Sequence, residues 1–394
     1  MRKNVLLIAF LFGIMFLFGY IANIRGVSYP LLRTEFDISY EHLGMFISII
    51  SFGYVIFCVV GGILLGNFGV KKSFLFGFIW MFFGLIGATL LPSFLFVAAA
   101  LFIISSSFGL LEINVNALAA QTFITKTGLY MSLLHFFFGF GAIVSPRVAG
   151  VIAVNLGWRQ IYFLSVPLAL IFITFSLLIQ FPKNASESGE QTLTKAANTK
   201  KVSYLAAVMN PMVWAFAIAL GLMLVIDISS SNWAALHFQD LYGLDPRISG
   251  AAFLSNYFIL FTISRLASGF FIEKVGYMRS LFITTFATII IFFIGFIFGA
   301  RGIYILPALG FFTAIHWPVT MAMAMRYFRE DAPIMTCAII PIAGAINALI
   351  QFLIGLTNRY IGPAWGYRSN LFYAVLIILA LVLLARRMRT QYLA

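Results

Sequence analysis

Charged residues are scarce in this chain. Only 9% of its 394 residues are Asp, Glu, Lys or Arg, whereas 62% are hydrophobic and 17% aromatic. A soluble globular domain is about one-quarter charged, so this composition excludes a water-soluble fold. The hydrophobic residues form runs of helical length along the whole chain, for example residues 5–22 and 371–385. Runs of this kind cross about 30 Å of hydrocarbon as helices, and we expect an all-α membrane protein.

Cysteine and the motifs of enzymes are also nearly absent. Cys58 and Cys337 both lie in apolar runs and are interpreted as small hydrophobic residues. The sequence has no phosphate-binding Gly-Lys-Ser/Thr loop, no Cys or His pair at metal spacing and no nucleophile elbow. We therefore predict that the protein is not an enzyme and has no cofactor or metal. With no nucleotide site, any movement of a solute by the protein would have to be driven by an ion gradient or by the solute's own gradient.

Acidic residues are fewer than basic ones, 12 against 25, which gives a formal net charge of +13. The basic residues stand in pairs and triplets beside the apolar runs, as in the cytoplasmic loops of membrane proteins. We therefore expect a lipid bilayer as partner and no nucleic acid. Sixteen Lys and Arg lie on the side that holds both termini and seven on the other, which places both termini in the cytoplasm.

The apolar runs predict twelve membrane-spanning helices, six on each side of the polar segment 182–201. We expect an N-terminal six-helix bundle (1–181), a cytoplasmic linker (182–206) and a C-terminal six-helix bundle (207–394). The expected spans are 5–30, 42–66, 73–91, 94–122, 128–153, 159–181, 208–237, 247–272, 278–299, 302–327, 333–357 and 367–386.

The two halves repeat each other. After spans two and eight, Gly62 matches Gly269 and Gly69 matches Gly276, both pairs 207 residues apart. At the start of spans six and twelve, the stretches "NLGWRQIYF" and "AWGYRSNLFY" match Gly157 with Gly366 and Arg159 with Arg368, 209 residues apart. Such pseudo-symmetric halves, with a site at the membrane midplane between them, are typical of secondary transporters.

The whole chain resembles the major facilitator superfamily. This resemblance implies alternating access, a usually monomeric protein and a central cavity lined by spans one, four, seven and ten. Members carry a Gly-x-x-x-Asp-Arg-x-Gly-Arg-Arg-like loop between spans two and three, echoed between spans eight and nine, which braces the cytoplasmic helix ends. The first half departs from it, because Gly66 and Asn67 replace the acid and the arginine. The residues assigned to this gating loop are Gly62, Gly69, Gly269, Glu273, Lys274 and Gly276.

Two further stretches are similar to the fucose–proton symporter group and its sugar-transporter-like relatives. They are "LLHFFFGFGAIVSP" (133–146) in span five and "SSSNWAALHFQDLYGLDP" (229–246) at the end of span seven. The glycine-rich run also partly matches the antiporter signature of span five, through Gly139, Gly141, Pro146 and Gly150. The direction of transport therefore stays open.

Polar residues in the first half are the first candidates for the site. Glu112 and Asn116 share a helix face, and Glu112 is ~15 Å from the cytoplasmic end of its helix. An acid at this depth faces the bundle interior or water. His135 lies at a similar depth in span five, so a proton-carrying Glu112–His135 pair is one hypothesis. The alternative is that His135 only ties span five to span four.

The second half offers a matching set. Span seven carries Asp227, a further proton-coupling candidate, and then Ser230, Asn232 and Trp233, which are suited to the hydroxyls and ring face of a sugar. His316 and Thr320 share a face in span ten, next to Trp317. His316 is 204 residues after Glu112, close to the repeat distance, so equivalent positions are expected. Helix packing is the alternative for all of these.

Span one adds Asn23 and Arg25, where Arg25 is either a cavity charge or a residue that reaches the outer surface. Together these features favour a secondary transporter in the inner (cytoplasmic) membrane that moves a sugar or sugar derivative with a proton, or with sodium. The alternative is a proton-coupled efflux antiporter for amphipathic compounds or lipids. A receptor without transport is disfavoured, because the chain contains no sizeable soluble domain.

Overall fold

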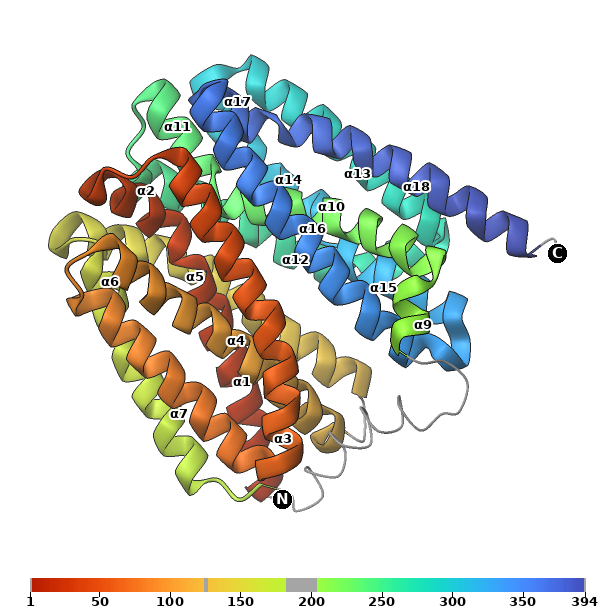
Figure 1. Cartoon of the computed structure of the whole chain (residues 1–394), viewed down its shortest axis with the longest axis horizontal. Coiled ribbons are helices and arrows are strands. Elements are labelled where there is room, and N and C mark those ends of the chain that lie inside the picture. Colours follow the sequence, from red (N-terminus) through yellow and green to blue (C-terminus); the bar gives the residue numbers. More distant parts are fainter. Residues whose placement is uncertain (1, 124–126, 182–203, 393–394) are drawn as a thin grey trace. The chain divides into compact units, whose positions relative to one another are not determined.

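The computed structural model describes residues 2–123, 127–181 and 204–392. In this part of the chain every regular element is a helix, and 11 helical stretches are long and apolar enough to cross a membrane (Figure 1). Helix α3 (Tyr40–Leu90) has 51 residues and leaves helical geometry at Gly69. One crossing needs about 20 residues, so α3 supplies two, and the predicted all-α fold with twelve spans is confirmed.

The helices follow from the lipid environment. Hydrocarbon offers no partner for backbone N–H and C=O groups, so each segment must satisfy them internally. The outward side chains are apolar as well: Leu95 is 73% exposed and Leu178 is 76% exposed. Exposed leucines on a helix surface are stable in lipid and costly in water. The exposed side chains therefore support the membrane environment that the composition predicts.

The described residues of the first half form seven helices. Their bounds are α1 (Arg2–Asn23), α2 (Arg25–Phe36), α3 (Tyr40–Leu90), α4 (Phe94–Thr122), α5 (Thr127–Leu156), α6 (Arg159–Phe163) and α7 (Val166–Leu178). Span one consists of α1 and α2, joined at Ile24, and span six consists of α6 and α7.

The second half has more interruptions. Its α-helices are α9 (Tyr204–Met209), α10 (Pro211–Asn232), α11 (Ala234–Tyr242), α12 (Ala251–Val275), α13 (Tyr277–Ile297), α14 (Leu309–Thr313), α15 (His316–Phe328), α16 (Ala332–Tyr360), α17 (Pro363–Arg368) and α18 (Asn370–Tyr392). Short helical turns are η1 (Pro246–Gly250), η2 (Gly299–Tyr304), η3 (Leu306–Ala308) and η4 (Arg329–Asp331). Span ten is built from η2, η3, α14 and α15, and its helix is broken before His316.

The chain divides into two compact units. The first comprises Met1–Ile38 with Ile49–Thr194, and the second comprises Ser39–Ser48 with Lys195–Ala394. The first ten residues of the second unit include the start of α3, where the Tyr40 hydroxyl donates to Asp240. Most of the predicted linker (182–206) lies outside the described residues, so the predicted domain boundaries stay predictions.

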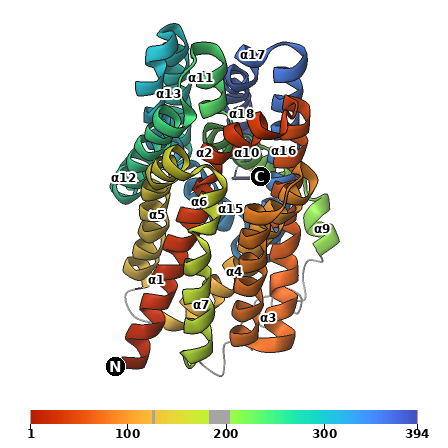
Figure 2. The same cartoon turned by 90° about the vertical axis from the view of Figure 1, so that its left-hand side faces the viewer.

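Within the first unit, α1 packs along α5, and the two helices lie side by side in Figures 1 and 2. A Cβ added to Gly19 would lie 1.9 Å from the carbonyl oxygen of Phe138. A Cβ added to Gly141 would lie 2.2 Å from that of Phe16. The glycine-rich run of span five thus lets two backbones approach, as small residues do between membrane helices.

Within the second unit, α10 packs on α16 and α18. The side chain of Asn210 caps α10 by accepting a hydrogen bond from the Met212 amide at 2.8 Å. Asp245 caps η1 in the same way, and Arg247 donates to both of its carboxylate oxygens. These hydrogen bonds from Arg247 hold the pKa of Asp245 below its usual value.

The turns before spans six and twelve correct one sequence match. The sequence aligned Gly157 with Gly366. In the structure the left-handed backbone occurs at Gly157, with a φ of 90°, and at Gly362, with a φ of 124°. Gly366 lies inside α17, where an added Cβ would meet the side chain of Asn358. The positions that share a backbone conformation are therefore Gly157 and Gly362, one helical turn away from the sequence match.

Candidate functional site

In the first unit, Glu112 has a fixed hydrogen-bond donor. Glu112 is half-buried in α4, ten residues before the helix ends at Thr122. The Tyr54 hydroxyl, from α3, donates to its Oε2 at 2.5 Å. The approach of the two helices depends on Gly109, since a Cβ there would lie 2.3 Å from the backbone oxygen of Tyr54. Glycine and tyrosine together place a hydroxyl against the intramembrane carboxylate.

The second unit repeats this arrangement with a different acid. The Tyr257 hydroxyl, from α12, donates to Oδ1 of Asp227 in α10 at 2.6 Å. The same hydroxyl lies 3.0 Å from Oγ1 of Thr313 in α14. A Cβ on Gly310 would lie 2.2 Å from the backbone oxygen of Tyr257. Asp227 is half-buried, so each unit contains one tyrosine–carboxylate pair.

The contacts of Tyr54 and Tyr257 show which residues of the two units correspond to each other. Gly109 and Gly310 both pack against the backbone of the tyrosine, and both stand three residues before the partner of its hydroxyl. By this criterion Glu112 corresponds to Thr313. The first unit therefore carries its acid on span four, while the second carries its acid on span seven.

Spans one and seven also correspond to each other. Ser28 in α2 lies 2.7 Å from the hydroxyl of Tyr162 in α6. Ser230 in α10 lies 3.2 Å from the hydroxyl of Tyr367 in α17. All four side chains are buried. Ser230, a predicted cavity residue, thus ties span seven to span twelve, as Ser28 ties span one to span six.

The separation of these two serines along the sequence also identifies a further pair of corresponding residues, Arg25 and Asp227. Ser230 follows Ser28 by 202 residues, and Gly221 follows Gly19 by the same number. Gly221 packs on span eleven as Gly19 packs on span five. Because both matches bracket the same stretch of helix, Arg25 and Asp227, also 202 residues apart, occupy equivalent positions. One unit carries a positive charge where the other carries a negative one.

Arg25 lines a small cavity inside the first unit. The cavity has a volume of about 20 Å³, and its polar lining consists of Arg25, Tyr29, Ser105 and Tyr162. A volume of this size holds about one water molecule. Arg25 thus lines a cavity, as one of the two sequence hypotheses expects, and its role stays a prediction.

Trp233 is more enclosed than the sequence suggested. Its side chain is 1% exposed, and its indole N–H donates to Gln351 at 2.8 Å. Gln351 donates in turn to Asn347 at 3.1 Å, within α16. The neighbouring Asn232 is buried, and its Oδ1 has no hydrogen-bond partner among the described residues. The predicted stacking of Trp233 on a sugar ring stays a prediction, and the observed contacts are those of a packing residue.

His316 lies against span nine. It is the first residue of α15, it is 1% exposed, and its Nε2 is 3.3 Å from Oγ1 of Thr284 in α13. In the first unit Asn114 donates to Ser73 at 2.8 Å and so joins span four to span three. The contacts therefore match His316 with Asn114. The expected equivalence of Glu112 and His316 is wrong by these contacts.

The other predicted cavity residues have varied surroundings. The Asn23 side chain donates to the carbonyl of Gly19 within α1 at 2.8 Å. The Thr320 hydroxyl contacts the sulfur of Met223 at 3.5 Å, and Trp317 is half-buried. Their roles as cavity residues stay predictions.

Asn116 and His135 are exposed on α4 and α5. The described partner of Glu112 is Tyr54. A proton-carrying pair of Glu112 with His135 stays a prediction.

The two gating loops share their backbone conformation. Gly69 has a φ of 77° and Gly276 a φ of 88°, values that favour glycine. Each glycine separates two consecutive spans, as the sequence match predicted. Gly62 lies in α3, while Gly269 and Glu273 lie in α12, as does Lys274, which is exposed.

The braces at these loops differ between the units. In the first unit Lys71 donates to the carbonyl of Leu177 at 2.7 Å, near the end of α7. A lysine at a helix C-terminus also interacts favourably with the helix dipole. In the second unit the guanidinium of Arg326 lies 4.4 Å from the ring centre of Tyr277. The loop of the first unit lacks the family's acid and arginine, and the contact described there is made by Lys71.

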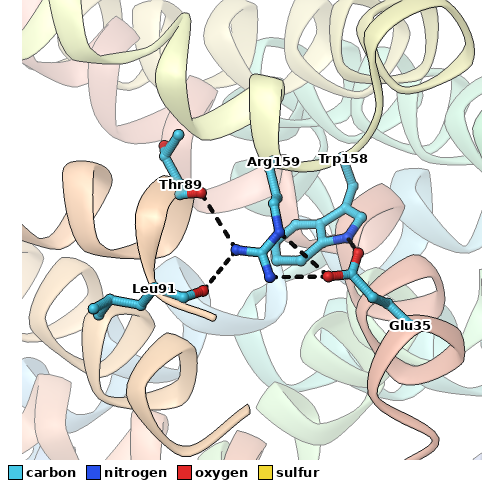
Figure 3. A network of polar contacts seen from close by, with 5 residues as sticks. All are labelled: Glu35, Thr89, Leu91, Trp158 and Arg159. Carbon is cyan, nitrogen blue, oxygen red and sulfur yellow. Dashed lines mark hydrogen bonds and ion pairs between the residues drawn. The ribbon is translucent and has the colours of Figure 1, made fainter. Parts of the chain in front are cut away.

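A polar network joins helix ends in the first unit (Figure 3). Glu35, in α2, accepts a hydrogen bond from Arg159 Nη2 at 2.9 Å and another from the indole N–H of Trp158. Arg159 Nη1 donates to the carbonyls of Leu91, at 2.8 Å, and of Thr89, at 3.3 Å. Because those carbonyls end α3, one arginine fixes three helix ends.

Comparison with known proteins gives the family. The model of the Major Facilitator Superfamily matches residues 11–335. The chain belongs to the Major Facilitator Superfamily. It is a multi-pass membrane transporter and not an enzyme, as the sequence predicted.

Individual relatives are distant. The chain is 26% identical over 191 residues to the probable sulfoacetate transporter SauU of Cupriavidus necator, over 46% of this chain but only 43% of that protein. It is 23% identical to the cis,cis-muconate transport protein of Acinetobacter baylyi, over 68% and 67% of the two chains. A crystal structure of a D-xylose–proton symporter superimposes with a TM-score of 0.75 at 17% identity, covering 97% and 96% of the two chains. This last likeness shows the shared fold.

Proposed function

We propose that this protein is a proton-coupled symporter that carries a small polar solute across the cytoplasmic membrane by alternating access. The observation that carries the proposal is the 2.5 Å hydrogen bond from Tyr54 to Glu112 in the middle of α4. A sugar or sugar derivative is the substrate favoured by the sequence. The names of the relatives support a small polar solute, since two are assigned to organic acids and one to a sugar with a proton.

Glu112 has the properties that a proton carrier requires. Low-dielectric surroundings favour the neutral acid, and a hydrogen bond to the carboxylate favours the charged form. Tyr54 supplies that hydrogen bond and so stabilises the charged form of Glu112. The low-dielectric surroundings stabilise the neutral form. Coupled transport needs both states, because the proton is loaded on one side of the membrane and released on the other.

The substitution Glu112→Gln tests the proposal. It keeps the size and the hydrogen bonding of the side chain but fixes the neutral form. We expect the variant to bind substrate and exchange it in liposomes, but not to accumulate substrate against a gradient. Exchange should also lose its dependence on pH. The measurement compares counterflow with uptake driven by a proton gradient, with a sodium gradient as a separate arm.

Glu330→Gln is the matched control, because Glu330 is an exposed acid in η4. It should accumulate substrate like the parent. If Glu112→Gln also accumulates substrate like the parent, Glu112 is structural. Asp227, with its donor Tyr257, then becomes the proton site to test.

The alternative is proton-coupled efflux of amphipathic compounds or lipids. Its sequence support is the partial antiporter signature in α5, and part of that run now has a packing role, since Gly141 lies against α1. A thermal-shift screen of the purified protein against sugars, organic acids and amphipathic cations separates the two functions. A ligand stabilises the folded state to which it binds, so stabilisation by amphipathic cations alone would favour efflux.

A further inference from the structure

Arg25 lies inside the apolar stretch Val5–Phe36 and not at its end. After Arg25 the helix α2 continues for eleven residues to Phe36, which corresponds to about 16 Å of helix. The side chain is half-buried and lines the small cavity in the first unit together with Tyr29, Ser105 and Tyr162. A charge at such a depth in a spanning helix is costly unless something compensates it.

Within the described part of the chain, no carboxylate compensates Arg25. The remaining lining of the cavity is apolar, namely Ile21, Ala22, Ile50, Leu101, Ile104 and Phe108. Among the described residues, no Asp or Glu forms an ion pair with Arg25. For a partly buried guanidinium without an anion, neutral hydroxyl groups offset only part of the desolvation cost.

Two other arginines of the described residues have such partners. Arg159 is paired with Glu35 at 2.9 Å, and Arg247 with Asp245 at 2.7 Å. Arg265 is compensated in another way, since it donates to a backbone carbonyl and lies over an aromatic ring at 4.5 Å. Arg25 differs from Arg159 and Arg247 because its cavity offers hydroxyl groups but no negative charge.

We infer that Arg25 binds the acidic group of the substrate, and that the substrate is a small organic anion carrying a carboxylate or sulfonate, sugar acids included. The guanidinium is suited to such a group because its N–H donors match the geometry of two acidic oxygens. The hydroxyls of Ser105, Tyr29 and Tyr162 add neutral hydrogen-bonding groups around it. This assignment rests on the proposed transport function and specifies its substrate class.

The equivalent position in the second unit does not offer a second site of this kind. Asp227 stands there, and a carboxylate repels an anion. The protein should therefore bind one acidic group at this pair of positions. A neutral sugar would leave Arg25 without compensation.

Matched pairs of probes test the inference by binding to the purified full-length protein. Each pair consists of an anion and a neutral compound of the same chain length: gluconate with sorbitol, adipate with 1,6-hexanediol, and isethionate with ethylene glycol. Thermal shift and calorimetry are measured for the parent, Arg25→Gln, Arg25→Lys and the control Arg301→Gln, which changes an exposed arginine. Counterflow of any bound probe is measured in liposomes with the parent.

We expect the parent to bind at least one anion more tightly than its neutral partner. Arg25→Gln should weaken that binding about tenfold or more, because a hydrogen-bonded charge pair is lost. Arg25→Lys should retain part of the preference, and Arg301→Gln all of it. The unfolding temperature without ligand shows that each variant is folded, and if Arg25→Gln does not fold, the result with Arg25→Lys decides. If Arg25→Lys then binds the anion as tightly as the parent does, the inference is overturned.

The outcomes separate this inference from the proposed function. Equal anion binding by the parent and Arg25→Gln overturns the assignment of Arg25 and leaves proton-coupled transport standing. Preferred binding of the neutral partners overturns the anionic substrate class in the same way. Absence of binding and counterflow for every probe contradicts the transport function as proposed, and the inference falls with it.

Discussion

At the scale of single residues, the intramembrane acids are defined by the tyrosines that contact them. Tyr54 and Tyr257 donate to Glu112 and Asp227, and a glycine of a neighbouring helix, Gly109 or Gly310, packs against the backbone of each tyrosine. Both acids can be predicted from the sequence, because a carboxylate is conspicuous in an apolar run. Neither tyrosine can, because tyrosine is common in membrane helices and carries no charge.

The substitution Tyr54→Phe should change coupling without removing transport. The loss of the hydroxyl leaves the charged form of Glu112 without its donor, so the carboxyl should release its proton less readily. We expect proton-driven uptake to move to higher pH, while substrate affinity changes little. The measurement is uptake into liposomes across a series of pH values.

Tyr257→Phe and Tyr304→Phe complete this experiment. Tyr304 is 82% exposed, so Tyr304→Phe should behave like the parent. Tyr257→Phe removes the donor of Asp227 instead. A shift in the pH profile caused by Tyr257→Phe and not by Tyr54→Phe would assign the proton to Asp227 and contradict the proposed role of Glu112.

At the scale of helices, close contacts decide which side chains meet. The carbonyl of Tyr54 occupies the space that a side chain at position 109 would need, and Tyr257 does the same at position 310. A glycine in a helix weakens the helix, yet Gly109 brings Tyr54 within reach of Glu112, and Gly310 brings Tyr257 within reach of Thr313. The spacing of apolar residues could predict the helices but not these approaches.

We predict that Gly109→Ala destabilises the protein by about 1–3 kcal/mol, as insertion of a methyl group into a filled space does. The added Cβ would lie 2.3 Å from a backbone oxygen, so α3 and α4 must separate. Uptake should fall together with thermal stability, because the Tyr54–Glu112 hydrogen bond is stretched. The measurements are thermal unfolding in detergent and liposome uptake.

Gly66→Ala is the matched control for this prediction. Gly66 also lies in α3, but nothing is within 4 Å of an added Cβ. Alanine is favoured over glycine in a helix by up to about 1 kcal/mol, so this variant should be as stable as the parent or slightly more so. Equal stability of the two variants would show that the packing at Gly109 is not tight.

At the scale of the whole molecule, the sequence was sufficient for the architecture. Long apolar runs gave the twelve spans, and the repeated glycines marked the bends at Gly69 and Gly276. The correspondence of individual residues between the two halves could not be found with one constant distance along the sequence. The tyrosines of the two pairs are 203 residues apart, whereas these glycines are 207 apart, so the second half has one extra helical turn between them.

The varying distance explains which parts of the site were missed. A distance of 204 residues matched Glu112 with His316, whereas the contacts match it with Thr313, 201 residues away. Tyr54 and Glu112 are 58 residues apart in sequence. Their meeting depends on the rotation of α3 against α4, about which a uniformly apolar helix surface carries little information.

Orientation in the membrane gives the prediction at this scale. After replacement of Cys58 and Cys337 by serine, single cysteines are introduced as Lys274→Cys and Tyr304→Cys, both at exposed positions. An impermeant maleimide should label Tyr304→Cys in intact cells and Lys274→Cys only in inside-out vesicles. The reverse pattern would contradict the assignment of sixteen basic residues to the cytoplasm.

The opposite charges at Arg25 and Asp227 also bear on how the chain arose. A half-length ancestor that worked as a pair of identical copies would have presented the same side chain at both positions. If the two halves arose by such a duplication, the difference between Arg25 and Asp227 therefore dates from after the gene was duplicated and joined. From that point neither half could replace the other: a chain made of two first halves would keep the helices and lose the acid at this position, and one made of two second halves would lose the arginine.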